Sequence, residues 1–129
     1  MRFVLLVLLA VLCWTPSAYC MDAANELQGS CEQFLRAYRP SGNQGFSLQA
    51  SSPGVWECWG FITGLQQLTV VADEQHRGRL LGVCTPPEST GVQLVRVVVT
   101  YLQRHPENLH RSAGVMALAA LQEAFPCQQ

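Results

Sequence analysis

The chain has 129 residues, with 8 Lys and Arg against 9 Asp and Glu, so its formal net charge is −1. This length is typical of one domain, and a hydrophobic fraction of 49% is enough to form one core. The balanced charge excludes the strongly basic surface that proteins use to bind nucleic acids or anionic membranes, and we expect neither as a partner.

The N-terminal segment has the layout of a secretory signal peptide. Arg2 is followed by an apolar run up to Trp14, and then by Pro16 and small residues. This run is shorter than the roughly 20 apolar residues of a transmembrane helix. We therefore expect a signal peptide over residues 1–20, cleavage after Cys20, and a mature domain over residues 21–129 that is not held in a membrane. Lipidation of Cys20 and a retained N-terminal anchor are the alternatives.

Cleavage of the signal would leave four cysteines, namely Cys31, Cys58, Cys84 and Cys127. An even number of cysteines in a small exported domain predicts two disulfides. A zinc site is the alternative, but none of these cysteines forms the closely spaced pair that is typical of zinc ligands.

An apolar stripe at helical spacing predicts the first helix, over residues 22–38. The stripe consists of Leu27, Cys31, Phe34, Leu35 and Tyr38. Residues 39–53 are rich in Pro, Gly and Ser and predict a loop. Pro53 then favours the start of a strongly apolar helix through residues 54–71. We interpret Gly60 and Gly64 within it as a feature that lets another helix of the fold pack closely.

The next segment is rich in valine, as strands are, yet its pattern predicts a helix over residues 91–104. Its polar residues recur at helical spacing, and its apolar residues share the opposite face. These polar residues are Gln93, Arg96, Thr100 and Gln103. A fourth helix follows Pro106 and ends before Pro126. The predicted fold class is therefore all-α, a small four-helix domain stapled by two disulfides.

The sequence His105-Pro106-Glu107 predicts a corner between the last two helices. Pro106 disfavours the helical conformation at His105 and suits a new first turn, where Glu107 meets the positive end of the helix. Catalysis or metal binding by His105 and His110 is the alternative. These two histidines are separated by a helix break, however, and do not have the i, i+4 spacing of ligands on one face. No serine lies in a nucleophile turn, so we expect no enzyme activity and no cofactor.

The same corner favours one of the three possible disulfide pairings. If the last two helices fold back antiparallel, the start of the first lies near the end of the second. Cys84 would then meet Cys127, and Cys31 would join Cys58 across the first two helices.

Three linked motifs cover most of the chain from residue 54 to residue 127. They read "ECWGFITG", "CTPPESTGVQLVRVVVTYLQRHPENLH" and "ALAALQEAFPC". Together they resemble the Rap/Tai family, the periplasmic immunity proteins that bacteria use against amidase effectors of type VI secretion. The resemblance implies a periplasmic, disulfide-bonded helical protein, either a monomer or a homodimer, that binds a papain-like cysteine amidase and blocks its cleft. A general periplasmic binding or chaperone-like module of unknown partner is the alternative function.

If the protein is an inhibitor, its partner surface should lie on loops. We expect the connection over residues 73–83 to contribute, because it combines charged with apolar side chains. The candidate interface residues are His76, Arg77, Arg79, Leu80 and Leu81, with Phe46 of the earlier loop as a further anchor. Ordinary solvated loops are the alternative for both segments.

Overall fold

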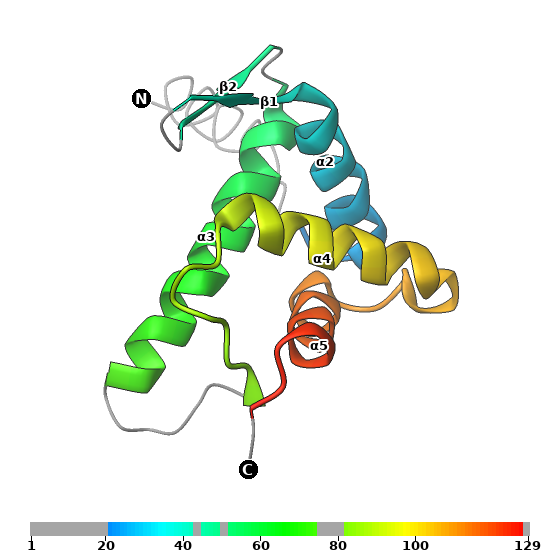
Figure 1. Ribbon diagram of the computed structural model, residues 1–129. Coiled ribbons are helices and arrows are strands. Elements are labelled where there is room, and N and C mark those ends of the chain that lie inside the picture. Colours follow the sequence, from blue (N-terminus) through cyan, green and yellow to red (C-terminus); the bar gives the residue numbers. More distant parts are fainter. Residues whose placement is uncertain (1–20, 43–44, 50–51, 75–81, 128–129) are drawn as a thin grey trace, which may run out of the picture.

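The computed structural model describes residues 21–42, 45–49, 52–74 and 82–127. It contains the helices α2 (Ala24–Ala37), α3 (Pro53–Glu74), α4 (Gly91–Arg104) and α5 (Ala113–Ala124) and the short 3-10 helix η2 (Pro106–Asn108). Strands β1 (Tyr38–Ser41) and β2 (Gly45–Leu48) form a small antiparallel sheet at one end of the molecule (Figure 1). Within these ranges no helix is both long and apolar enough to cross a membrane. The predicted signal peptide lies outside them.

The four predicted helices and the two disulfides are confirmed, but the domain is mostly helical and not purely all-α. Part of the segment expected as a loop forms a β-hairpin, in which Tyr38 pairs with Leu48 and Pro40 with Phe46. Strands of four residues are too short to display an alternating pattern in the sequence. A proline is tolerated here because every strand of a two-stranded sheet is an edge strand.

The valine-rich segment forms the predicted helix, since α4 has the expected bounds. Thr90 caps it by accepting a hydrogen bond from the backbone N–H of Gln93 at 3.2 Å. The apolar face of α4 is buried and its polar face is exposed, as the helical spacing predicted. The buried residues are Leu94, Val95, Val98, Val99 and Leu102.

The corner after α4 is longer than the sequence predicted. Pro106 begins η2, whereas α5 begins only at Ala113. The intervening carbonyls accept hydrogen bonds from the start of α2, with Ala24 N donating to Arg111 O at 2.8 Å. The first turn of α2 has no side-chain cap. The turn between η2 and α5 therefore satisfies free N–H groups of another helix.

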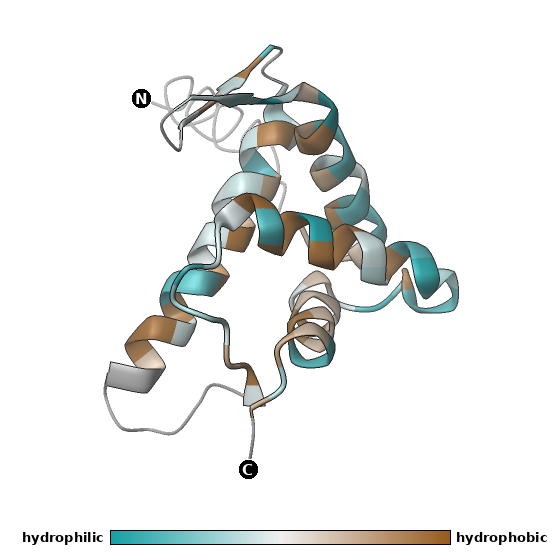
Figure 2. Ribbon diagram, in the orientation of Figure 1, coloured by the Kyte–Doolittle hydropathy of each residue, from teal (hydrophilic) through white to brown (hydrophobic). Residues whose placement is uncertain are grey.

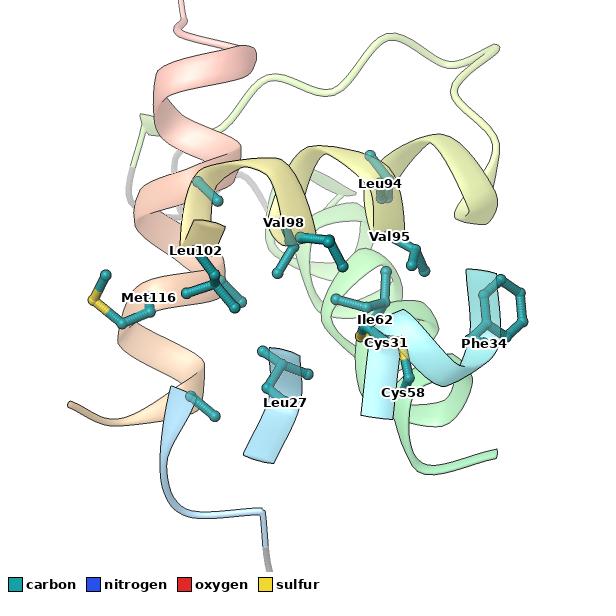
Figure 3. Packing of buried hydrophobic residues seen from close by; sticks show 14 of the residues in the cluster. Leu27, Cys31, Phe34, Cys58, Ile62, Leu94, Val95, Val98, Leu102 and Met116 are labelled. Carbon is teal, nitrogen blue, oxygen red and sulfur yellow. A yellow bond between two sulfur atoms is a disulfide. The ribbon is translucent and has the colours of Figure 1, made fainter. Parts of the chain in front are cut away.

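One core lies where the four helices meet (Figure 3). All four helices contribute fully buried side chains to it, and α3 contributes mainly through its first half. The largest of these side chains are Phe34 and Leu27 of α2, Ile62 of α3, Leu94 and Leu102 of α4, and Met116 and Leu121 of α5.

Two disulfides fasten this arrangement, and they are the two pairs that the predicted corner favoured. Cys31–Cys58 joins α2 to α3, and both residues are fully buried. Cys84–Cys127 joins the segment before α4 to the segment after α5. Beside the second bond, Val83 pairs with Pro126 in an isolated β-bridge. Each disulfide thus reinforces a contact between two elements.

The closest approach of α3 and α4 requires a glycine. A Cβ added to Gly91 would lie 2.7 Å from Cη2 of Trp59. We expect Gly91→Ala to lower the free energy of unfolding by about 1 to 3 kcal/mol, because the rigid indole ring has to shift. Gly29→Ala is the matched control, since a Cβ there meets nothing within 4 Å. The control should stabilise α2 by about 0.5 to 1 kcal/mol. Equal urea midpoints for the two variants would contradict this account.

Candidate functional site

The largest exposed apolar side chains of the described residues gather on α3. Trp56 exposes 55% of its surface and Leu68 exposes 59%, and Val70 and Val71 are about half exposed. The opposite side of the same helix buries Ile62 and its neighbours in the core. We define the outer face of α3 as Trp56, Gly60, Gly64, Leu68 and Val71, which follow one another at helical spacing.

The outer face of α3 carries no charge over most of its length. Residues 58–72 contain no acidic or basic side chain. Figure 2 shows a hydrophilic band followed by a hydrophobic one in the second half of α3, where that helix extends away from the other helices. The polar side chains of this stretch, among them the exposed Gln67, are all uncharged. An exposed apolar surface of this kind marks a site of interaction with another molecule.

Two glycines flatten this face. Gly60 and Gly64 are both exposed, and a Cβ added at either would meet nothing within 4 Å. The interpretation that they accommodate another helix of the fold is therefore wrong for the described part of the chain. They leave a strip on which the backbone of a partner can approach α3 closely.

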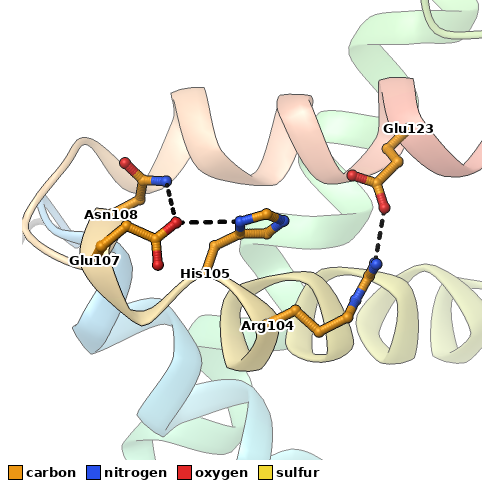
Figure 4. A network of polar contacts seen from close by, with 5 residues as sticks. All are labelled: Arg104, His105, Glu107, Asn108 and Glu123. Atoms are coloured by element: carbon orange, nitrogen blue, oxygen red, sulfur yellow. Dashed lines mark hydrogen bonds and ion pairs between the residues drawn. The ribbon is translucent and has the colours of Figure 1, made fainter.

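The corner that the sequence placed at His105, Pro106 and Glu107 is a small polar network (Figure 4). The Oε1 atom of Glu107 lies 3.3 Å from Nδ1 of His105 and accepts a hydrogen bond from Asn108 Nδ2 at 3.2 Å. The ring of His105 also packs on Tyr101, with centroids 4.4 Å apart. In the described ranges no three His, Cys, Asp or Glu side chains form a group that could hold a metal ion. These contacts order the corner.

Two carboxylates make the stability of the fold depend on pH. A hydrogen bond from its own backbone, followed by the contact with His105, lowers the pKa of Glu107 below its ordinary value of 4.5. Hydrogen bonds from Gln28 and then Gln103 lower the pKa of Glu32. A carboxylate whose pKa is lowered by folding contributes stability above its unfolded pKa and loses it as the pH falls through the folded pKa.

We therefore expect Glu107→Gln to destabilise the protein most above pH 4.5. The difference in unfolding free energy between the wild type and this variant should shrink as the pH falls further, because the wild-type carboxylate becomes protonated. Urea denaturation of both proteins between about pH 3 and pH 7 measures this difference. A difference that stays constant over the range would show that Glu107 acts without its charge.

The interface residues expected from the sequence are placed only in part. His76, Arg77, Arg79, Leu80 and Leu81 lie outside the described residues. Phe46 is half-buried, with its ring centroid 5.0 Å from that of Trp59 and 6.0 Å from that of Phe34. Its main contact is thus with the core, to which it anchors the hairpin.

A family model matches nearly the whole of this fold. The model of the Rap1a immunity proteins matches residues 20–127, which include α2 to α5 and both disulfides. The chain belongs to the Rap1a immunity protein family. This confirms the resemblance that the three motifs indicated. Searches of curated proteins and of solved structures find no match. As a Rap1a immunity protein, the chain has an immunity role in which it binds a protein effector.

Sequence reasoning missed the outer face of α3 as the candidate site of this Rap1a protein. It placed the partner surface on loops and interpreted Gly60 and Gly64 as a packing site within the fold. One signal was available, namely the absence of charge from residue 58 to residue 72. A helix that buries one side in a domain of this size normally carries charges on the other.

Proposed function

We propose that this immunity protein binds a secreted peptidoglycan amidase in the periplasm and blocks its active cleft. The exposed apolar outer face of α3 carries the proposal, because it is the kind of surface that a protein partner covers. Export would follow from the signal peptide predicted over residues 1–20. The partner class, a papain-like cysteine amidase, comes from the resemblance of the three sequence motifs.

The outer face has the composition of an interface core. Such cores are depleted of charge and enriched in aromatic residues, and tryptophan is a frequent hot spot. Trp56 supplies the aromatic side chain, and Leu68 and Val71 extend the apolar area. The chain continues from α3 into residues 75–81, so we propose that His76, Arg77, Arg79, Leu80 and Leu81 add to the same partner surface.

We propose that inhibition is steric and that the protein performs no reaction of its own. The four cysteines of the proposed mature domain are joined in disulfides, so that domain has no free thiol to act as a nucleophile. Coverage of the amidase cleft by an apolar helix would be enough to exclude the substrate.

The test is co-expression of the exported protein with the product of the adjacent gene, followed by size exclusion and a peptidoglycan-cleavage assay. We expect a stable complex that silences cleavage. Leu68→Asp should weaken it at least about thirtyfold, as loss of a hot spot does, because it places a charge in an apolar interface. Val115→Asp is the control, since Val115 on α5 is similarly exposed at 52% but lies outside the outer face. Equal inhibition of the amidase by both variants would show that the outer face of α3 is not part of the interface.

A homodimer is the competing use of the outer face. Gly60 and Gly64 would let the α3 helices of two copies cross closely. Size exclusion of the protein alone distinguishes the two uses. If the protein elutes as a monomer, and its elution volume changes only when the amidase is added, the outer face binds the effector. If the protein elutes as a dimer and Leu68→Asp disrupts that dimer, the outer face binds a second copy.

The alternative function is a general periplasmic binding or chaperone-like module. The uncharged outer face also suits unfolded clients, which present apolar segments without a defined shape. That function predicts weak binding to several unrelated unfolded proteins and no protection of the cell wall. The cleavage assay therefore separates the two functions.

A further inference from the structure

The polar side of α4 forms a ridge between two open grooves. We define the α4 ridge as Arg96 and Thr100, because both residues line both grooves. The groove toward α2 has a volume of about 460 Å³, and the groove toward α5 has a volume of about 310 Å³. Each groove has apolar lining residues, Leu35 and Val99 in the first and Val97 and Ala120 in the second.

Each groove also contains an arginine that already has a carboxylate partner. Arg36 lies 3.7 Å from Glu32 in the groove toward α2. Arg104 lies 2.8 Å from Glu123 in the groove toward α5, as Figure 4 shows. Arg96 is exposed between them and has no hydrogen bond or ion pair with any described residue. The ridge and its grooves therefore hold three arginines and two glutamates, on a chain whose net charge is −1.

We propose that Arg96 binds a carboxylate on an acidic segment of the effector, and that apolar side chains beside this carboxylate enter the two grooves. A guanidinium group binds a carboxylate through two parallel hydrogen bonds, and its methylene stem covers apolar surface. Arg104 already donates a hydrogen bond to Glu123, and Arg36 forms an ion pair with Glu32. Of the three arginines that line the grooves, Arg96 is thus the one whose guanidinium group is available to a new partner.

The surroundings of Arg96 favour an acidic protein segment over a nucleic acid. Proteins that bind single strands combine several unpaired cations with aromatic stacking platforms. Here a single unpaired arginine stands between two grooves that each combine apolar side chains with an arginine–glutamate pair, and no aromatic residue lines either groove. This pattern matches a bound protein segment in which an acidic side chain lies between two aliphatic ones.

The first test uses a peptide and does not need the effector. A capped peptide with one glutamate between two leucines is titrated into the 15N-labelled exported protein, and the same peptide with glutamine is the control. We expect the glutamate peptide to shift the amide resonances of Arg96 and Thr100. Both the glutamine peptide and Arg96→Ala should weaken binding at least about tenfold.

Two further variants make this result specific. Arg96→Lys keeps the charge but loses the paired hydrogen bonds, so it should bind with intermediate affinity. Arg111→Ala removes an exposed arginine that lies outside both grooves, and it should bind as the wild type does. Equal binding of the two peptides, or wild-type binding by Arg96→Ala, would overturn the proposal. Displacement of the peptide by single-stranded DNA of similar charge would also overturn it.

The second test uses the amidase complex and rests on the proposed function. Arg96→Ala should weaken the complex at least about tenfold, and added salt should reduce the difference from the wild type. If the wild type binds the glutamate peptide but no amidase, the proposed function fails and the carboxylate site stands. If Arg96→Ala binds the amidase as tightly as the wild type, this inference fails and the proposed function stands.

Discussion

Replacement of Cys31 and Cys58 by alanine is expected to lower the free energy of unfolding by about 3 to 5 kcal/mol. The bond closes a loop whose ends are 27 residues apart, and both cysteines are fully buried between α2 and α3. The variant therefore loses a constraint on the unfolded chain and also core packing. Small domains have only about 5 to 15 kcal/mol of stability in total, so this loss is a large share of it. Urea denaturation measures the loss.

The matched variant replaces Cys84 and Cys127. This bond closes a longer loop of 43 residues, so chain entropy alone predicts a cost greater by about 0.4 kcal/mol than for the first bond. Cys84 and Cys127 are only half-buried, however, and their removal disturbs less packing. We therefore expect the first pair to cost more. The opposite order would show that loop entropy dominates, and a loss below about 1 kcal/mol for the first pair would contradict its structural role.

Phe34→Ala is expected to cost about 3 to 5 kcal/mol as well. Phe34 is fully buried and stacks on Trp59, with ring centroids 5.2 Å apart and planes inclined by 9°. It also contacts Phe46 at 6.0 Å and thereby connects α2, α3 and the hairpin. Its loss opens a cavity under the hairpin. Relative to the wild type, this substitution should increase the rate of amide hydrogen exchange more in β1 and β2 than in α5.

The control for this substitution is Phe46→Ala. Phe46 belongs to the same aromatic cluster but is only half-buried, so less apolar surface becomes exposed and a smaller loss is expected. If the two substitutions cost the same, the stacking of Phe34 on Trp59 contributes nothing beyond the anchoring of the hairpin.

The helices could be predicted where local pattern and tertiary contacts agree. In α4 the spacing of Gln93, Arg96, Thr100 and Gln103 outweighed the strand propensity of its valines, because burial of one face matters more than propensity. The hairpin depends on the packing of Phe46 on residues of two helices, which its own sequence does not reveal. The start of α5 depends on hydrogen bonds to the start of α2, which are equally invisible in a local pattern.

The candidate site was less predictable than the fold. The sequence showed that α3 is strongly apolar, but not that its second half extends beyond the other helices. Whether Gly60 and Gly64 face the core or the solvent depends on which neighbours the helix meets, and that is a property of the whole fold. Arg96 was placed correctly on the polar face of α4. Its lack of an ionic partner appears only when the positions of Glu32 and Glu123 are known.

The two disulfides divide the polypeptide into halves that share no crosslink. Cys31–Cys58 lies within the half that contains α2 and α3, and Cys84–Cys127 lies within the half that contains α4 and α5. The backbone between Glu74 and Gly82 is the covalent connection between the halves. A single proteolytic cut there would leave two pieces, each closed by its own bond and held to the other by side-chain packing and by hydrogen bonds such as that from Ala24 N to Arg111 O. Such a chain is suited to fragment complementation, in which two separately made polypeptides reassemble and the strength of their reassembly measures the core directly.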